Sequence, residues 1–355
     1  MFVYVGCYTT PDRAGGGEGI NVYRMDDHSG VWEHSQLLPG IANPSFLALD
    51  PSQRFLYCVH GGNTFSAVSA FAVAQGSGSL TFLNTQPSGG HNPVHLAVHP
   101  SGRFLIVASY ADATVAALPI NADGTLAPIR SLLPQTGNPG PDRIEQASPH
   151  PHHSPFDPLG RFVVVPDKGV DAVFVYRFDD ARGTLTPSDP PFVRARPGAG
   201  PRHVAFHPTA PYAYVINELD STVTAYGYDA ERGVPEPRQV IGMLPPAYTG
   251  RSTGAEIAVA PSGQFLYASN RGHDSIAIFA IRRETGMLTA VGWEPTQGTM
   301  PRFFALDPAG QFLYVANQGS GTIVTFRVDI VTGGLTPTGH IVRTDSPVCI
   351  VFAEG

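Results

Sequence analysis

Short apolar runs separated by proline-containing turns recur along the whole chain. In "GPRHVAFHPTAPYAYVINEL", residues 200–219, an apolar run, a turn with two prolines and a second apolar run follow one another. Short apolar runs bounded by turn residues are typical of β-strands. In the unit that begins at Gly254, two more strand-like runs follow, "DSIAIFAI" and "MLTAVGWE". The pattern therefore predicts units of four antiparallel strands.

These units repeat along the chain with a period of roughly 50 residues, which is typical of β-propeller blades. Their turn prolines are Pro51, Pro100, Pro158, Pro208, Pro261 and Pro308. Six units extend from Asn43 to about Asp345. The C-terminal "SPVCIVFAEG" matches a first strand, and the N-terminal "MFVYVGCYTT" begins the other three strands of a seventh unit.

The sequence thus predicts an all-β fold, a seven-bladed β-propeller with four antiparallel strands per blade. The N- and C-terminal strands are expected to share one blade, which closes the ring and removes an open sheet edge. Residues 1–355 are expected to form this single domain.

Composition narrows the classes of partner. The formal net charge is -7, which argues against a nucleic-acid partner. No apolar run is long enough for a membrane span, and the N-terminus has no basic segment of the signal-peptide kind. The three cysteines show no C-x-x-C spacing. A cytoplasmic protein without a membrane partner is expected, and the oligomeric state is left open.

The repeat also predicts where polar side chains gather. The first strand of a blade starts, and the second ends, at the same end of the ring, so residues at these two places face one mouth. Around the ring the first place holds Val348, Ser45, Val94, His152, Arg202, Ala255 and Arg302. The second holds Tyr8, Gly61, Tyr110, Lys168, Glu218, Arg271 and Gln318.

This mouth combines several cations, a carboxylate and histidines, which favours an anion-binding, acid–base site. The expected substrate-binding residues are His203, Lys168, Arg302, Gln318, Tyr110 and His150. The alternative for any one of them is an ordinary solvated loop residue. The long link "SLLPQTGNPGPDRIEQASPHPH" leads to this mouth and is a candidate lid or wall.

Two groups of histidines have simpler explanations. His99 and His207 stand in the proline turns, where they are expected to cap the turn. The "HPHH" motif, residues 150–153, suggests a metal, but neighbouring residues of an extended strand point to opposite faces, so no metal site is expected.

Over its whole length the chain resembles the seven-bladed propeller lactonase family, which includes the cycloisomerase-type 6-phosphogluconolactonases and the fungal carboxymuconate-lactonizing enzymes. The resemblance rests on "SPHPHHSPFDPLGRFVVVPDKGVDAVFVY", "GPRHVAFHPTAPYAYVINELDSTV" and, above all, "SNRGHDSI". It implies His152, Arg202, Glu218 and Arg271 as catalytic residues. One departure is Lys168, where the family usually has a leucine.

The resemblance implies hydrolysis of a sugar-acid lactone, with an anionic small molecule as the partner. His152 or Glu218 would act as general base, and Arg202 or Arg271 would stabilise the oxyanion or grip an anionic group. The scheme needs no metal or other cofactor. The alternatives are lactonisation of a carboxymuconate and, from another class, a non-catalytic propeller that binds a protein or peptide.

Overall fold

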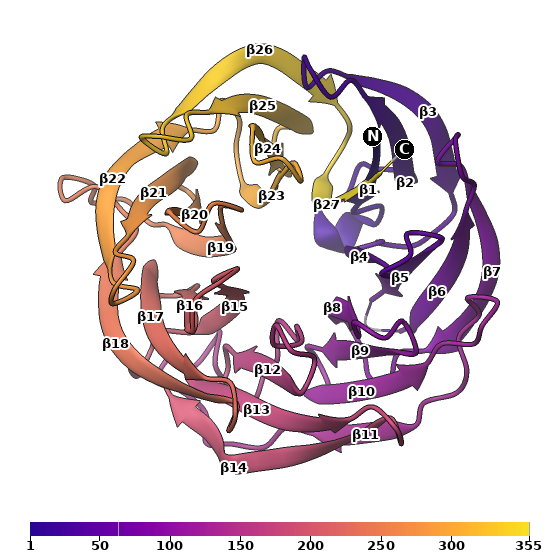
Figure 1. Ribbon diagram of the computed structural model, residues 1–355, viewed down its shortest axis with the longest axis horizontal. Helices are drawn as coiled ribbons and strands as arrows, with labels where there is room; N and C mark the ends of the chain where they lie inside the picture. Colours follow the sequence, from indigo (N-terminus) through magenta and orange to yellow (C-terminus); the bar gives the residue numbers. More distant parts are fainter. Residues whose placement is uncertain (63, 355) are drawn as a thin grey trace.

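Seven β-sheets stand in a ring around a central axis in the computed structural model, which describes residues 1–62 and 64–354 (Figure 1). Over these residues six sheets have four antiparallel strands and one has three regular strands. The predicted seven-bladed propeller is therefore confirmed. The helical content of the described chain is one 3-10 turn, η1 (Pro11–Arg13).

In every blade except the closing one, the strands follow one another outward from the axis in chain order. The innermost strands are β27 (Pro347–Ala353), β4 (Phe46–Leu49), β8 (Pro93–Val98), β15 (Pro201–Phe206), β19 (Thr253–Val259) and β23 (Pro301–Leu306). The second strands are β1 (Phe2–Cys7), β5 (Phe55–Gly61), β9 (Phe104–Ser109), β12 (Phe162–Asp167), β16 (Tyr212–Asn217), β20 (Phe265–Arg271) and β24 (Phe312–Asn317).

The outer half of each blade consists of two further strands. The third strands are β2 (Gly19–Met25), β6 (Ser66–Val73), β10 (Thr114–Pro119), β13 (Ala172–Asp179), β17 (Thr222–Asp229), β21 (Ser275–Ile281) and β25 (Thr322–Val328). The outermost are β3 (Trp32–Pro39), β7 (Leu80–Pro87), β11 (Ser131–Pro134), β14 (Thr184–Arg194), β18 (Val234–Gly242), β22 (Leu288–Pro295) and β26 (Leu335–Arg343).

The closing blade contains both ends of the chain. β27 pairs antiparallel with β1, with Phe2 opposite Ala353 and Val5 opposite Ile350, and β1 continues outward to β2 and β3. The two termini lie beside each other in Figure 1. The predicted closure by strands from both ends is confirmed.

One inner strand departs from regular pairing. In the blade of β12, β13 and β14, the fourth blade when the closing blade is counted first, the innermost strand is replaced by residues 149–156. These residues touch β12 through the isolated bridges Pro151–Asp167 and Phe156–Val163. The backbone N–H of His152 still donates to the Pro166 carbonyl oxygen over 3.1 Å. Pro149, Pro151 and Pro155 have no N–H to donate, so a full ladder cannot form here.

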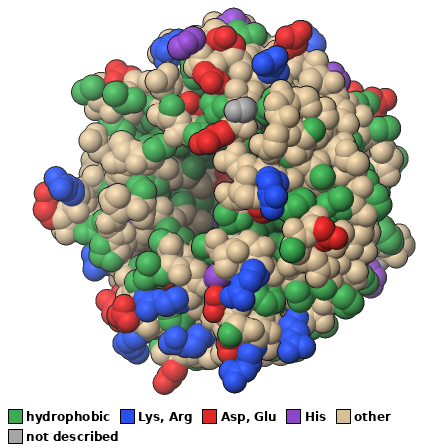
Figure 2. Space-filling view, turned by 45° about the vertical axis from the view of Figure 1, so that its right-hand side comes forward, with side chains coloured by type: hydrophobic (Ala, Val, Ile, Leu, Met, Phe, Trp, Pro, Cys, Tyr) green, Lys and Arg blue, Asp and Glu red, His purple; other side chains and the backbone are tan. Residues whose placement is uncertain are grey.

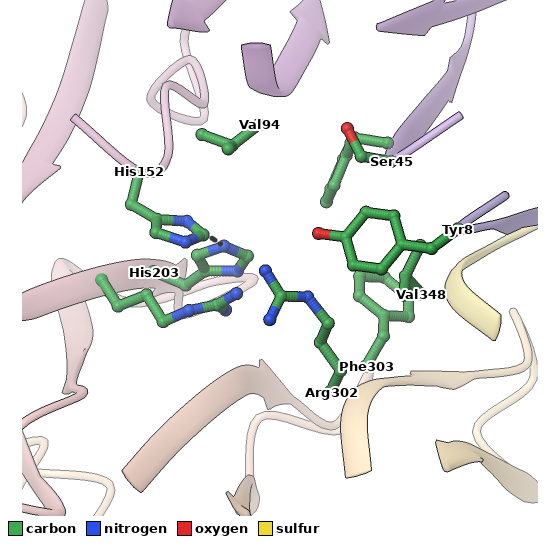
Figure 3. Close-up of a pocket in the computed structure, with 10 residues that line it drawn as sticks. Tyr8, Ser45, Val94, His152, His203, Arg302, Phe303 and Val348 are labelled. Carbon is green, nitrogen blue, oxygen red and sulfur yellow. Dashed lines mark hydrogen bonds between the residues drawn. The ribbon is translucent and has the colours of Figure 1, made fainter. Parts of the chain in front are cut away.

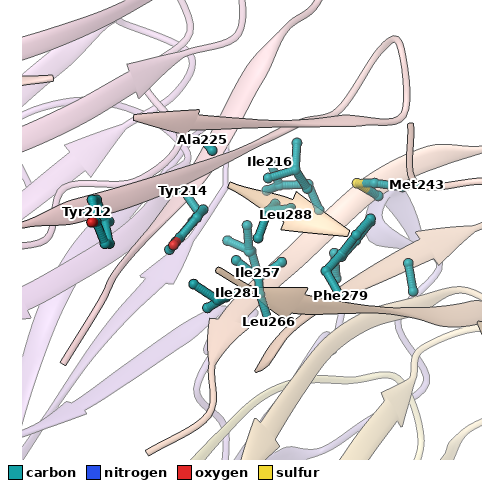
Figure 4. Packing of buried hydrophobic residues seen from close by; sticks show 13 residues of the cluster. Tyr212, Tyr214, Ile216, Ala225, Met243, Ile257, Leu266, Phe279, Ile281 and Leu288 are labelled. Atoms are coloured by element: carbon teal, nitrogen blue, oxygen red, sulfur yellow. The ribbon is translucent and has the colours of Figure 1, made fainter. Parts of the chain in front are cut away.

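The core lies between adjacent blades. Figure 4 shows one interface, in which Tyr214 and Ile216 of β16 pack with Ile257 of β19 and Phe279 of β21. β16 is buried along its whole length, whereas the outermost strand β18 of the same blade is buried only at Val234 and Pro235 and is half-buried or exposed beyond them. Each blade therefore depends on its two neighbours to cover its apolar faces.

The proline turns lie at the other end of the inner strands from the mouth. His207 follows β15 and its Nδ1 accepts the N–H groups of Thr209 and Ala210, so the predicted capping role is confirmed for this histidine. Its Nε2 donates to the Gly263 carbonyl oxygen of the next blade. Gly263 has φ +71°, and a Cβ there would lie 2.6 Å from the His207 ring, so both backbone and space require glycine.

Charged side chains are spread over the surface in both signs. Figure 2 shows acidic and basic groups interspersed around a face that is hollowed near its middle. Several form exposed pairs, such as Arg103 with Asp180 and Arg182 with Asp179. Within residues 1–62 and 64–354, no helix is long and apolar enough to cross a membrane.

Candidate active site

Two adjoining pockets lie at the mouth where the inner strands begin. The outer pocket has a volume of about 190 Å³ and is lined by Arg13, Asn92, Val94, Tyr110, His152, Lys168, Glu218, Arg271 and Arg302. The inner one has about 20 Å³, room for roughly one water molecule. It is lined by Tyr8, Ser45, Phe46, Val94, His152, Arg202, His203, Arg302, Phe303 and Val348. Val94, His152 and Arg302 belong to both pockets.

Irregular strand starts aim pairs of neighbouring residues into this site. The register between β15 and β16 shifts between Pro201 and His203, so Arg202 is an extra residue in β15. In a regular strand Arg202 and His203 would point to opposite faces, but both line the inner pocket. β23 shows the same shift, and Arg302 and Phe303 both line it too. Figure 3 shows His203 from β15 and Arg302 and Phe303 from β23 converging from different blades.

Glu218 is the centre of a buried ion cluster. Its Oε2 lies 3.0 Å from Arg202 Nε and 3.3 Å from Arg271 Nη2, and its Oε1 lies 3.4 Å from Lys168 Nζ. Burial alone would raise the pKa of Glu218, but Arg271, Lys168 and Arg202 outweigh it and lower the pKa to about 2. Glu218 is therefore a carboxylate at neutral pH and a weak proton acceptor.

Two guanidinium groups keep unused donors in this cluster. Arg202 Nη1 donates to the Ala255 carbonyl oxygen over 2.5 Å, and Arg271 Nη2 donates to the Gly254 carbonyl oxygen over 2.8 Å. The Nε atoms of both arginines are buried without a hydrogen-bond acceptor among the described residues, since the contact of Arg202 Nε with Glu218 lacks hydrogen-bond geometry. Buried donors of this kind favour an anionic ligand at the site.

Lys168 connects the site to the long link before the fourth blade. Its Nζ lies 2.7 Å from Glu145 Oε2 and 5.2 Å from the centroid of the Tyr110 ring. Gln146 of the same link donates to the Lys168 carbonyl oxygen over 2.8 Å. This link therefore forms a wall of the mouth. Its Glu145 neutralises part of the positive charge that the cations give to the mouth.

Four histidine rings pack at the base of the pockets. His153 stacks on His203 with centroids 4.2 Å apart, His95 lies 3.9 Å from His153, and His152 lies 5.2 Å from His203. Burial lowers the pKa of His152 well below 6.5, and Arg202, Arg302 and Lys168 lower it further. His152 is therefore neutral at pH 7 and can accept a proton.

The expectation that His152 and His153 point to opposite faces is wrong, because both contact the His203 ring. The irregular, proline-rich segment does not alternate as a strand does. The histidines nevertheless stack on one another rather than surround a point. Among residues 1–62 and 64–354 no group of three or more His, Cys, Asp or Glu side chains is arranged to hold a metal.

The structure places the other expected binding residues as follows. His150 does not line either pocket but stacks on Tyr110 with centroids 4.2 Å apart. Gln318 also lies behind the lining, and its Nε2 donates to the Arg13 carbonyl oxygen over 3.3 Å. Arg13 itself was not predicted, because it comes from the loop between β1 and β2 and not from a repeated position.

The buried histidines lead to a prediction about stability. The pKa values of His95, His152 and His203 are well below 6.5, and that of His153 is about 3, with burial as the main cause. Groups whose folded pKa is lowered stabilise the protein above their unfolded pKa, and this contribution is lost as the pH falls. We therefore expect the melting temperature to drop between about pH 6.5 and pH 5.

Buried carboxyl groups act in the opposite direction, and Glu256 and Asp167 have the largest shifts among them. Burial raises the pKa of Glu256 to about 8 and that of Asp167 to about 7, which favours the folded state at lower pH. Burial also lowers the pKa of His60 to about 4, and the resulting five histidines outnumber the two carboxyl groups with the largest shifts, so the net drop should remain. Calorimetry at both pH values tests this, and His153→Gln, which cannot titrate there, should show a shallower drop. Equal melting temperatures of the unaltered chain at both pH values would contradict the prediction.

Comparisons with known proteins cover the whole ring. A family model described as "Lactonase, 7-bladed beta-propeller" matches residues 2–352. The 6-phosphogluconolactonase of Bacillus subtilis (strain 168) is 36% identical over 304 residues, which is 86% of this chain and 84% of that protein. The matched family span includes strands of the closing blade from both ends of the chain.

Solved structures give the same picture. A putative 6-phosphogluconolactonase from Bacteroides fragilis NCTC 9343 superposes with a TM-score of 0.92 at 32% identity, covering 99% of this chain and 98% of that chain. The periplasmic gluconolactonase of Pseudomonas aeruginosa also has a TM-score of 0.92 at 32% identity, with 99% of both chains covered.

Proposed function

Because the chain belongs to the seven-bladed β-propeller lactonase family, we propose that it hydrolyses an anionic sugar-acid lactone, with 6-phosphogluconolactone as the first candidate. The observation that carries this proposal is the position of His152. It stands between a cation-lined outer pocket and an inner pocket with the volume of one water molecule. A lactone in the outer pocket would have a water and a base on its inner side.

The reaction would proceed by attack of this water. His152 takes one proton from the water while the oxygen bonds to the lactone carbonyl carbon. Arg302, which lines both pockets with His152, donates to the resulting oxyanion. The carbon–oxygen bond of the ring then breaks, and the departing oxygen takes the proton from the imidazolium. The product is a hydroxy acid, which releases a proton to neutral solution.

The other cations would bind the anionic group of the substrate. Arg271, Lys168 and Arg13 line the outer pocket, and Arg271 Nε is free to donate. Glu218 would hold Arg202 and Arg271 in place, because it contacts both. Its low pKa argues against Glu218 as the general base.

A lactone panel tests the proposal. Proton release at pH 7 is measured with 6-phosphogluconolactone, neutral gluconolactone and a carboxylated lactone, each corrected for spontaneous opening. We expect the highest kcat/KM for a charged lactone. A carboxymuconate assay is the matched alternative. Cyclisation without hydrolysis would replace the proposal with lactonisation, and no turnover in either assay would favour a non-catalytic propeller.

Replacement of Arg271 by lysine should not be conservative. Lysine keeps the charge but loses the planar set of donors that reaches Glu218, the Gly254 carbonyl and a ligand. We expect kcat/KM for the charged lactone to fall by roughly 10- to 10²-fold. Arg103→Lys, which changes an exposed arginine paired with Asp180, is the control and should leave kcat/KM unchanged. Equal values for both variants would show that Arg271 has no role in binding.

The cytoplasmic location of the protein also remains a prediction. The three cysteines are buried and unpaired within the described residues, which suits the cytoplasm. One of the similar structures is nevertheless that of a periplasmic gluconolactonase.

A further inference from the structure

A chain of hydrogen bonds leads from the buried interior to the pockets. The carboxylate oxygens of Glu256 on β19 lie 3.1 and 3.2 Å from His203 Nδ1. His203 Nε2 lies 3.3 Å from His152 Nδ1, the contact drawn as a dashed line in Figure 3. No hydrogen bond joins His152 Nε2 to another residue of the described chain. This nitrogen is therefore free to contact a molecule in the pockets that His152 lines.

Glu256 is isolated from solvent at the inner end of this chain. It is 6% exposed, compared with 2% for His203 and 6% for His152. The register of β19 shifts between Gly254 and Ile257, and Glu256, which lies within this shift, points at His203 of the preceding blade. The alternation of inward and outward residues along a regular strand cannot identify Glu256, because the register shift lies within β19.

Few charged groups act on Glu256. Arg202 on β15 favours its ionised form, the Ile257 N–H donates to Oε1 over 3.0 Å, and Cys349 on β27 is a further titratable neighbour. His152, at the other end, faces Arg202, Arg302 and Lys168. Burial raises the pKa of Glu256 to about 8, so Glu256 changes its protonation state within the pH range in which enzymes are usually assayed.

The protons along this chain can be arranged in two ways. When Glu256 is ionised, His203 Nδ1–H donates to it, His203 Nε2 accepts from His152 Nδ1–H, and His152 Nε2 carries a lone pair. When Glu256 is protonated, its O–H donates to His203 Nδ1, His203 Nε2–H donates to His152 Nδ1, and His152 Nε2 carries a hydrogen. Only the first arrangement presents a base to the cavity.

We propose that Glu256 is a positioning residue that sets the tautomer of His152 through His203, so that its ionised form makes His152 Nε2 a proton acceptor. This inference deepens the proposed function and rests on it only for the role of His152 as base. It also explains how a buried imidazole surrounded by cations remains basic enough to act, because the carboxylate stabilises the charge that develops on the two rings.

The first test reads the tautomer directly and needs no substrate. The ¹⁵N chemical shifts of the imidazole nitrogens are recorded between about pH 6 and pH 9.5, and His152 is assigned by difference from His152→Asn. We expect hydrogen on Nε2 at low pH and on Nδ1 at high pH. In Glu256→Gln the tautomer should not change with pH. A tautomer that changes identically in both proteins, or in neither, would overturn the proposal.

The second test uses lactone turnover. In the unaltered chain kcat should rise with pH as Glu256 ionises, because only then is His152 Nε2 a proton acceptor. For Glu256→Gln we expect kcat to fall on the order of 10²-fold with little change in KM, because no carboxylate stabilises the developing charge, and we expect the rise of kcat with pH to disappear. Should this variant fail to fold, His203→Gln interrupts the same chain without touching the carboxyl group, and it should give the same two results. A variant that retains the pH-dependent rise in kcat would contradict the proposal.

The two tests separate this inference from the proposed function. A His152 tautomer that follows Glu256, in a protein that hydrolyses no lactone, would leave the hydrogen-bonded chain valid and the function wrong. Normal lactone hydrolysis with an unchanging tautomer would leave the function valid and the role of Glu256 wrong.

Discussion

Deletion of the chain from Ser346 onward should unfold the ring or cause it to aggregate. The deletion removes β27, the innermost strand of the closing blade, whose Val348, Cys349 and Ile350 are at most 3% exposed. It also exposes the edge of β1. Burial of each such side chain contributes roughly 1.5–3 kcal/mol, against a total stability of about 5–15 kcal/mol. Four or five of them could account for most of that stability.

Gel filtration and thermal unfolding measure this effect. The matched control removes only residues 354 and 355, which retains all of β27 and should stay monodisperse with nearly the same melting temperature. The longer deletion keeps His152, Arg202, Glu218 and Arg271 but removes Val348 of the inner pocket, so the melting temperature and the oligomeric state, not activity, report on the ring. A soluble protein with an unaltered melting temperature after the longer deletion would contradict the importance of the closing strand.

The fold could be predicted because the same sequence pattern recurs in every blade. Apolar runs, proline turns and the period of roughly 50 residues are local features that six units share, and the matching ends supply the seventh. The exception is the first strand of the fourth blade. Its run "SPHPHHSPF" occupies the expected place, but the prolines leave only isolated bridges to β12.

The repeat also located most of the pocket lining. His152, Arg202, Glu218 and Arg271 stand at repeated positions, and the structure brings all four together. Their catalytic roles remain predictions. Repeat logic succeeds here because antiparallel pairing fixes which strand ends share a mouth, whatever the side chains are.

Other members of the site depend on features that do not repeat. Phe303 reaches the inner pocket because of a register shift, and Glu256 lies within such a shift in β19. Arg13 comes from a loop of irregular length, and Glu145 from the long link. A bulge changes which face every following residue takes. Alternation along the sequence therefore could not identify these residues.

His152→Ala should lower lactone turnover by roughly 10²-fold or more without unfolding the protein. The change removes the proposed base, whose contribution in general acid–base catalysis is about 10²- to 10⁴-fold. His152 borders both pockets, so the space it leaves is continuous with a cavity and the loss of packing is small. We expect kcat to fall much more than KM changes, because the charged group of the substrate contacts other residues.

A second buried histidine, His207, serves as the control for His152→Ala. His207 is 8% exposed compared with 6% for His152, but it lies at the far end of β15, where it caps a turn. His207→Ala should lower the melting temperature while the kcat of the folded protein stays the same. His152→Ala should do the reverse, with a strongly reduced kcat and a nearly unchanged melting temperature. If His152→Ala kept full activity, the base would have to be sought elsewhere, and His153 and His150 would be the next residues to replace.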